Sequence, residues 1–207
     1  MLMLKPFSWL GLAAVCISCS PAGTEADRPA SEPQAAIVEA AIAEPISLAP
    51  PAGSRDADAT ADIVNRAGDR IGSADLYQGT EGVVMRIAVT GLTPGAHGMH
   101  FHAIGTCEDA AAGFKATGGH VMPFGKPHGY MHPDGPHAGN LPNLIVGENG
   151  TATVEIYSAL VSLFEGDAAL LDEDGSTLII HENEDDHVTQ PIGGAGGRAA
   201  CGVIESP

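Results

Sequence analysis

Hydrophobic and polar residues alternate with a period of two along most of the chain after about residue 59. The alternation forms short runs bounded by Gly, Pro, Asn and Asp, and these runs cover residues 61–65, 70–77, 82–90, 97–103, 151–158, 177–181 and 200–204. A period of two is typical of half-buried strands, and no helix-like spacer separates the runs. The pattern predicts an all-β domain built as an antiparallel sandwich or barrel.

Two long segments break this alternation. Residues 106–143 and 182–198 are rich in glycine, proline and histidine and show no period of their own. Long loops inside a compact domain are usually functional. The two segments contain five of the nine histidines, which are His97, His100, His102, His120, His128, His132, His137, His181 and His187.

The histidine spacing favours a metal site. His100 and His102 lie two apart on a predicted strand, so both rings point to one face. His120, His128 and His137 follow at intervals of eight and nine, which suits a loop wrapped around an ion. Neutral imidazole is a common ligand of copper and zinc, and the acidic run 182–186 offers carboxylates that orient such rings. The other interpretation is that these are surface or capping histidines.

Charge excludes one large class of function. The 207 residues include 26 acidic and 9 basic side chains, a formal net charge of −17. Phosphate neutralisation needs clustered Lys and Arg, so we expect no nucleic-acid partner. No uninterrupted apolar run reaches the 18 or so residues of a membrane-spanning helix, and 27 Gly with 15 Pro predict many turns.

The N-terminus has the pattern of an export signal. Lys5 is the only charge before Cys19, and residues 9–18 form an apolar run of signal-peptide length. Ile17, Ser18 and Cys19 resemble the end of a bacterial lipobox, although Cys16 stands where leucine is usual. We expect residues 1–19 to be a signal peptide and Cys19 to be lipidated in the periplasm or cell envelope. Cleavage within residues 18–23 would instead give a secreted protein, and a cytosolic chain is the third alternative.

Residues 20–58 are rich in alanine, proline and acids, and their composition predicts a flexible tether. Residues 59–207 then form the folded domain. If Cys16 is removed and Cys19 is lipidated, Cys107 and Cys201 remain. In an oxidising compartment they form either a disulfide or two buried thiols.

The motifs together resemble the copper/zinc superoxide dismutases over nearly all of residues 59–204. The resemblance rests on HGMHFH at 97–102, GGH at 118–120, HG at 128–129, HAG at 137–139, HE at 181–182 and GGRAACGVI at 196–204. The short gap from His102 to Cys107 is similar to the bacterial envelope branch. The resemblance implies a Greek-key β-barrel of about eight strands with two long metal-site loops.

The resemblance also implies a role for individual residues. Copper would be bound by His100, His102, His120 and His181. Zinc would be bound by His128, His137 and the other nitrogen of His120, which would bridge the metals. Asp185 would orient ligands of both metals, Arg198 would stand beside the copper channel, Cys107 and Cys201 would be disulfide-bonded, and His97 would brace the barrel. The implied reaction converts superoxide to oxygen and hydrogen peroxide by alternate reduction and oxidation of copper. Arg198 would draw the anion in despite the acidic chain, or would only contact loop carbonyls.

One position departs from the family pattern. The family has an aspartate three residues after the last zinc histidine, and this chain has Asn140. A neutral amide binds zinc less strongly than a carboxylate, so we expect zinc to be weaker, open to water, or completed by Asp134. His132 and His187 match nothing in the pattern and are interpreted as solvent-exposed. The alternative function is a non-catalytic copper- or zinc-binding module on the same fold, acting as a metal store or chaperone. The oligomeric state is open between a monomer and a homodimer.

Overall fold

The computed structural model describes residues 56–207, so the predicted signal peptide, Cys19 and most of the predicted tether lie outside the described residues. Among the described residues, no helix has the length and apolar character needed to cross a membrane.

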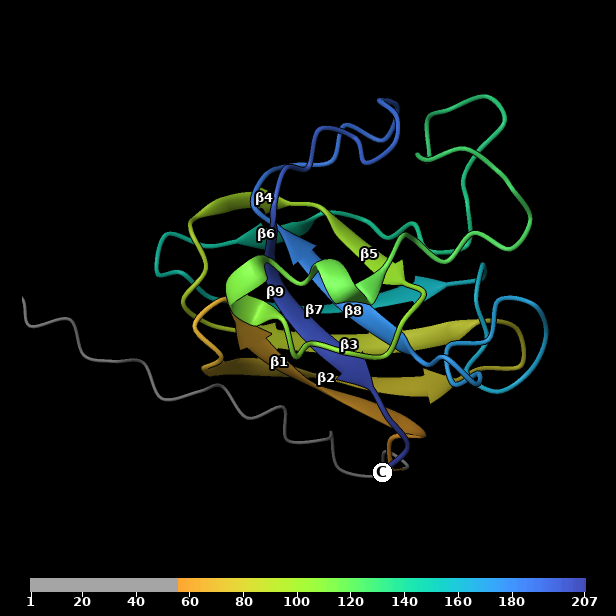
Figure 1. Ribbon diagram of the computed structural model, residues 1–207, viewed down its shortest axis with the longest axis horizontal. Helices are drawn as coiled ribbons and strands as arrows, with labels where there is room; N and C mark the ends of the chain where they lie inside the picture. The colour runs from red at the N-terminus through yellow and green to blue at the C-terminus, as the bar shows by residue number, and fades with distance from the viewer. Residues whose placement is uncertain (1–55) are drawn as a thin grey trace, which may run out of the picture. The chain divides into compact units, whose positions relative to one another are not determined.

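The regular secondary structure of the domain consists almost entirely of short strands (Figure 1). These are β1 (Ala59–Asn65), β2 (Arg70–Gln78), β3 (Val83–Val89), β4 (Gly95–His97), β5 (Met99–His102), β6 (Leu144–Val146), β7 (Ala152–Ser158), β8 (Ser176–His181) and β9 (Arg198–Ile204). Two 3₁₀ helices, η1 (Ala110–Ala112) and η2 (Lys115–Thr117), lie in the first long loop. The run predicted at 97–103 is divided between β4 and β5, and β6 was not predicted because it has only three residues.

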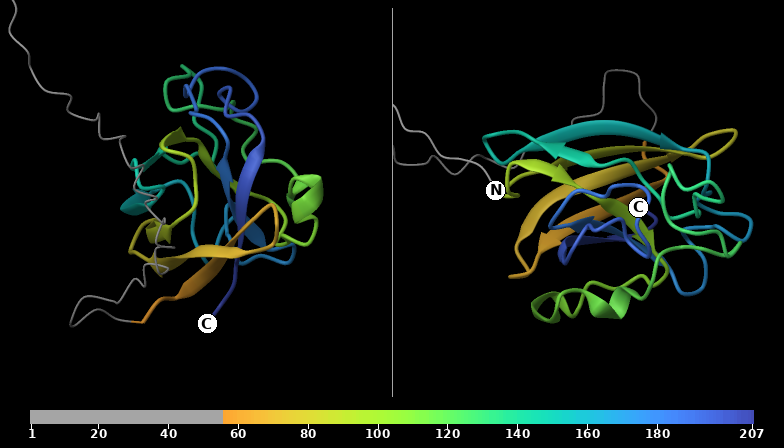
Figure 2. Two further views of the ribbon diagram at one scale, coloured as in Figure 1. Left: turned by 90° about the vertical axis from the view of Figure 1, so that its left-hand side faces the viewer. Right: turned by 90° about the horizontal axis from the view of Figure 1, so that it is seen from above.

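Seven strands form one antiparallel sheet in the order β5-β8-β9-β1-β2-β3-β7, and β4 pairs with β6 in a small second sheet. The first and last strands are therefore neighbours in the middle of the sheet, and β5 reaches β8 only through a long connection. Figure 2 shows the sheet curled on itself. The prediction of a Greek-key antiparallel barrel is confirmed.

The alternation read from the sequence places the core inside this curl. Along β3, Met85 and Ile87 are buried, whereas Arg86 points outward and pairs with Glu155 of β7 at 2.6 Å. Burying such apolar side chains contributes roughly 1.5–3 kcal/mol each. The core therefore gives the metal loops a rigid base.

Strand β5 is buried on both faces, which is what positions the histidines. Because the side-chain period is two, Met99 and Phe101 contribute to the apolar core while His100 and His102 point to the other face. The first long loop returns along the free edge of β5. There the N–H of Phe101 donates to Gly139 O, and its carbonyl accepts from Val121. A Cβ at position 139 would lie 2.5 Å from Phe101 O, so only glycine allows this approach.

A disulfide joins Cys107 of the first long loop to Cys201 of β9. It lies in a small apolar cluster with Phe114 and Ile179, outside the main core. The predicted disulfide is confirmed, and the alternative of two free thiols is excluded. The bond fixes the first long loop to the strand that begins with Arg198.

Candidate metal centre

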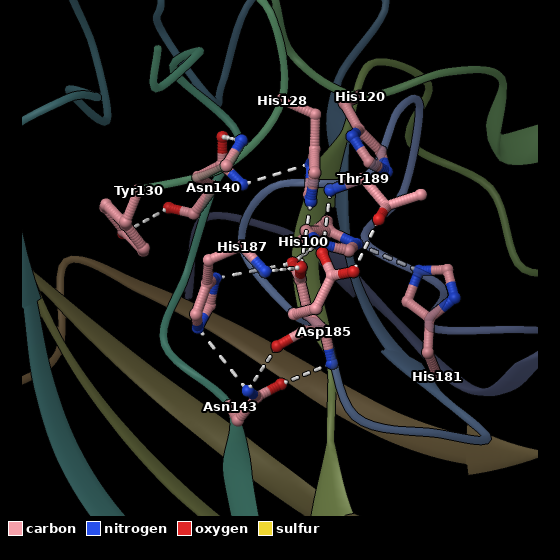
Figure 3. A network of polar contacts seen from close by, with 12 residues as sticks. His100, His120, His128, Tyr130, Asn140, Asn143, His181, Asp185, His187 and Thr189 are labelled. Carbon is pink, nitrogen blue, oxygen red and sulfur yellow. Dashed lines mark hydrogen bonds and ion pairs between the residues drawn. The ribbon is translucent and has the colours of Figure 1, made fainter. Parts of the chain in front are cut away.

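Six buried histidines converge where β5, the end of β8 and the first long loop meet. Figure 3 shows four of them, which are His100, His120, His128 and His181. Their ring nitrogens form two groups, and within each group the nitrogens lie within 4.8 Å of one another. His120 belongs to both groups. One group is His100, His102, His120 and His181; the other is His120, His128 and His137. These are the residues that the sequence grouped as copper and zinc ligands.

The outward nitrogens of four of these rings have fixed hydrogen-bond acceptors. His102 Nδ1 lies 3.1 Å from Gly118 O, and His181 Nδ1 lies 3.2 Å from Gly196 O. His100 Nε2 and His128 Nε2 lie 2.8 and 3.0 Å from the two oxygens of Asp185. Carbonyls and carboxylates only accept, so in each case the ring nitrogen carries the proton. A neutral imidazole then has an unprotonated nitrogen on its other side, pointing inward.

The inward nitrogens lack the partners that such lone pairs need. Among the described residues, His102 Nε2 and His120 Nε2 are buried without a hydrogen-bond partner. His100 Nδ1 and His181 Nε2 face each other at 3.0 Å although both are unprotonated. Lone pairs that converge in this way require a cation, and outward N–H groups held by carboxylate or carbonyl are the usual support of metal-bound histidine. The donor set fits copper.

The second group fits zinc. His137 Nε2 lies 2.8 Å from His120 Nδ1 and 3.3 Å from His128 Nδ1. Two nitrogens bound to one tetrahedral zinc at 2.0–2.1 Å are separated by about 3.3 Å. Both nitrogens of His120 thus face a metal group, so neither can keep a proton when both groups are filled.

Burial lowers the pKa of five of these rings, which favours their neutral form. It lowers the pKa of His102 to about 2 and the pKa values of His137 and His181 to about 4. Burial and the neighbouring histidines also hold the pKa of His120 far below its ordinary value. The site therefore offers unprotonated nitrogens at neutral pH without competition from protons.

Asp185 is a carboxylate shared by the two groups. Burial alone would raise its pKa, but hydrogen bonds from His100 and His128 and from the backbone N–H of His187 outweigh burial and hold that pKa well below its usual value. His100, His128 and Asp185 also form a third cluster of potential ligand atoms. The hydrogen bonds already account for that cluster, so it needs no third ion.

The sequence did not reveal two residues that hold Asp185. Asn143, just before β6, accepts from the backbone N–H of Asp185 at 2.9 Å and donates to its carbonyl at 2.8 Å. His187 donates its backbone N–H to Asp185 Oδ1 at 2.7 Å from a left-handed conformation, φ +59°, and its ring lies edge-on to Tyr130. The interpretation of His187 as solvent-exposed is wrong, because its side chain is only 16% exposed. No motif marks either residue, since each acts through the backbone of a loop.

The other histidines have structural contacts. His97 Nδ1 lies 2.7 Å from His181 O and its Nε2 lies 2.8 Å from Thr93 O, so this ring ties β4 to the end of β8. His132 is half-buried rather than exposed, and its Nδ1 accepts from the N–H of Asp134 at 3.1 Å. Asp134 itself is exposed and belongs to none of the metal groups found among residues 56–207. The suggestion that it completes the zinc site is therefore wrong.

A cavity of about 470 Å³ opens onto the first histidine group. His102, His120, His181 and Arg198 line it, together with two cations that the sequence did not single out, Arg66 and Lys115. Arg198 donates to Phe114 O, to Thr117 Oγ1 at 2.9 Å and to Gly118 O at 2.7 Å. The loop carbonyls therefore hold the guanidinium at the cavity wall, where its charge faces any anion that enters.

A β-barrel with two groups of histidine ligands that share the imidazole of His120 has the sites of a two-metal protein. Comparisons with known proteins agree. The family model described as copper/zinc superoxide dismutase (SODC) matches residues 70–204. The chain is 46% identical over 151 residues to superoxide dismutase [Cu-Zn] of Caulobacter vibrioides, covering 70% of this chain and 86% of that protein. It is 39% identical to superoxide dismutase [Cu-Zn] 2 of Aquifex aeolicus, covering 73% of this chain and 88% of that protein.

A solved structure gives the same picture. The crystal structure of a superoxide dismutase-like protein from Bacillus subtilis superposes with a TM-score of 0.66 at 38% identity, covering 70% of this chain and 96% of that chain. This chain belongs to the copper/zinc superoxide dismutase family. Its cofactors are copper and zinc, and it is an enzyme that disproportionates superoxide. The alternative of a non-catalytic metal store is not favoured.

Proposed function

We propose which residues of this superoxide dismutase bind copper and which bind zinc. Copper is held by four histidines, which are His100, His102, His120 and His181. Zinc is held by His120, His128 and His137, so His120 bridges the two ions. The observation that carries this assignment is that the outward N–H groups of the rings are held by protein acceptors while their lone pairs converge.

Copper supplies the two accessible oxidation states that the reaction needs, whereas zinc is redox-inert. The residues do the rest. Arg198 binds and orients the superoxide anion at the cavity wall, and the cavity confines the field of its charge. His120 Nε2, which has no other partner among the described residues, would accept a proton from solvent whenever it is not a copper ligand and would pass it to the departing peroxide, while solvent would supply the second proton. Asp185 keeps His100 and His128 in the tautomer that leaves their ligand nitrogens unprotonated.

A matched pair of variants tests the ligand assignment. His100→Gln removes a proposed copper ligand, and His132→Gln makes the same change in the first long loop outside the metal groups. Metal analysis of the purified chain and a superoxide-decay assay should show about one copper per chain and rapid decay for wild type and His132→Gln. His100→Gln should lose both the bound copper and the rapid superoxide decay. Copper content and decay that survive the combined replacement of His100 and His181 would refute the assignment.

The place of action is also a proposal. The apolar run at 9–18, followed by Cys19, supports export to the periplasm or cell envelope with a lipid anchor at Cys19. In this arrangement residues 20–58 tether the domain near the membrane surface. Cell fractionation should find the wild-type protein and Cys16→Ala in the membrane fraction and Cys19→Ala outside it. Wild-type protein in the soluble periplasmic fraction would favour plain secretion, and cytosolic protein would refute export.

A further inference from the structure

Asn140 stands at the zinc group but its amide is turned the wrong way to bind a cation. The residue is fully buried, with 0% exposure, and its Oδ1 accepts from the backbone N–H of Gly129 at 3.1 Å and of His137 at 3.2 Å. Backbone N–H groups can only donate, so the atom that faces them must be the oxygen. The amide nitrogen is therefore the atom that lies 3.2 Å from His128 Nδ1, one of the three nitrogens of the zinc group (Figure 3).

Exchanging the positions of the amide oxygen and nitrogen would not make Asn140 a zinc ligand. The oxygen would then face His128, but the NH₂ group would face the N–H groups of Gly129 and His137, which are both donors. Two buried donors would lose their acceptor, which proteins avoid. The backbone of Asn140 is also held, because Tyr130 donates its hydroxyl to Asn140 O at 2.8 Å. The surroundings thus select the orientation that keeps the oxygen away from the zinc group.

We infer that zinc in this protein has three histidine ligands and one coordination position left to solvent. Asn140 acts as a staple of the zinc loop: it joins Gly129 and His137 through its oxygen, and only in the metal-free protein does its nitrogen also donate to His128 Nδ1, the lone pair that zinc would take. The inference rests on the proposed zinc ligands and adds the state of the fourth position. Three protein ligands plus a water form the open type of zinc site, in contrast to the closed type with four protein ligands.

The arrangement has two consequences for metal exchange. An open zinc position gives a chelator or a small anion a point of attack, so zinc should leave faster than from a closed site. The staple, in contrast, needs no metal, because its hydrogen bonds are complete within the protein. The loop is therefore prepared for zinc before zinc arrives.

Zinc transfer from the purified holoenzyme to a chromophoric chelator tests this inference. Asn140→Asp supplies two oxygens, one for the backbone N–H groups and one for the open position, and should slow zinc transfer by about tenfold or more. Asn149→Asp is the matched control, because it adds the same charge at an exposed turn where the amide oxygen accepts from Thr151. It should leave the transfer rate unchanged. Equal rates for wild type and Asn140→Asp would overturn the inference.

A spectroscopic measurement reads the fourth position directly. Cobalt(II) replaces zinc while the copper group is filled with colourless copper(I), and sodium azide is the probe. Azide should change the visible spectrum of the wild-type protein and leave Asn140→Asp nearly unaffected. An unchanged wild-type spectrum would mean that the chain closes the site itself, and would overturn the inference. A wild-type protein that binds no copper or does not decompose superoxide would instead contradict the proposed copper ligands. Failure of the zinc inference and failure of the proposed function can therefore be told apart.

Asn140→Ala separates the staple from the open position. This variant removes the hydrogen bonds to Gly129 and His137 without adding a ligand. We expect faster zinc transfer than in wild type and lower thermal stability of the metal-free protein. If the metal-free variant is as stable as wild type and releases zinc at the same rate, Asn140 is not a staple.

Discussion

The carboxylate of Asp185 accepts a hydrogen bond from Nε2 of His100 over 2.8 Å, with both side chains fully buried. Its other oxygen accepts from His128 at 3.0 Å, so one carboxylate fixes a ring in each metal group. This relationship joins the two groups by a route that does not pass through His120. A change at Asp185 should therefore affect both metals together.

Replacing Asp185 with asparagine tests this coupling. The amide keeps one acceptor, weaker than a carboxylate oxygen, and puts an NH₂ group in place of the other, so one of His100 and His128 loses its acceptor and the other keeps only a weakened one. Retention of copper and zinc against a chelator should fall about 10- to 100-fold, the usual effect of removing such a partner. Asp186→Asn is the control, since Asp186 is exposed and binds Thr189 instead. Loss of only one metal would contradict the coupling.

Two adjacent glycines separate backbone strain from contact with Asp185. Gly193 and Gly194 both have left-handed backbones, with φ +63° and +73°. A Cβ at 193 would lie 1.7 Å from Asp185 Oδ1, whereas a Cβ at 194 would meet nothing within 4 Å. Each alanine substitution should cost about 1–2 kcal/mol of unfolding free energy from the backbone alone.

Only Gly193→Ala should also displace the carboxylate. We expect it to lower metal retention in the same way as Asp185→Asn, while Gly194→Ala retains both metals. Thermal unfolding and metal analysis of the two variants measure both effects. Equal metal content in the two variants would show that the backbone around Gly193 shifts to make room for the methyl group without moving Asp185.

The sequence predicted most of the barrel because alternation and turn residues are local signals. It missed β6, whose three residues are too few for a period, and it predicted one run at 97–103 where the structure has β4 and β5. The metal histidines were found because their residue type is itself the signal. Asn143 and Arg66 were not found, because a backbone-binding amide and a turn arginine resemble ordinary surface residues until the chain folds. The orientation of Asn140 depends on two backbone N–H groups, and their position cannot be read from composition or spacing.

The stability of the metal-free protein should depend on pH in a defined window. Burial lowers the pKa values of His137 and His181 from the ordinary 6.5 to about 4. Below pH 6.5 the unfolded chain takes up protons at these rings and the native protein does not, so the free energy of unfolding falls until about pH 4. Each such histidine adds a slope of up to about 1.4 kcal/mol per pH unit.

Asp185 acts in a lower window. Its pKa is held below the ordinary 3.8, so its stabilising contribution is complete above that value and is lost only in stronger acid. Denaturant unfolding of the metal-free protein at a series of pH values measures both windows. His181→Gln should reduce the slope between pH 6.5 and 4, because one titrating ring is removed. A free energy of unfolding that is constant from pH 7 to 5 would contradict the assignment of neutral buried histidines.

Arg198 gives the last prediction, because the structure supports both of the roles that the sequence left open. Its guanidinium is bound to the carbonyls of Phe114 and Gly118, and it also lines the cavity that leads to His102 and His120. Removing it therefore removes a charge and an anchor of the loop. Arg198→Lys keeps the charge but cannot reproduce the fork of donors, so it separates the two roles.

If the charge attracts superoxide, Arg198→Ala should slow turnover by about tenfold at low ionic strength and flatten its dependence on salt, while Arg198→Lys retains most of both. Arg70→Ala is the control, because Arg70 is exposed and pairs with Asp62 at 2.7 Å outside the cavity lining. It removes the same charge and should leave turnover nearly unchanged. If Arg198→Lys is as slow as Arg198→Ala, the anchor matters more than the charge. An unchanged rate in Arg198→Ala would remove this residue from the reaction, and the attraction of superoxide into an acidic protein would then have to come from Arg66 and Lys115.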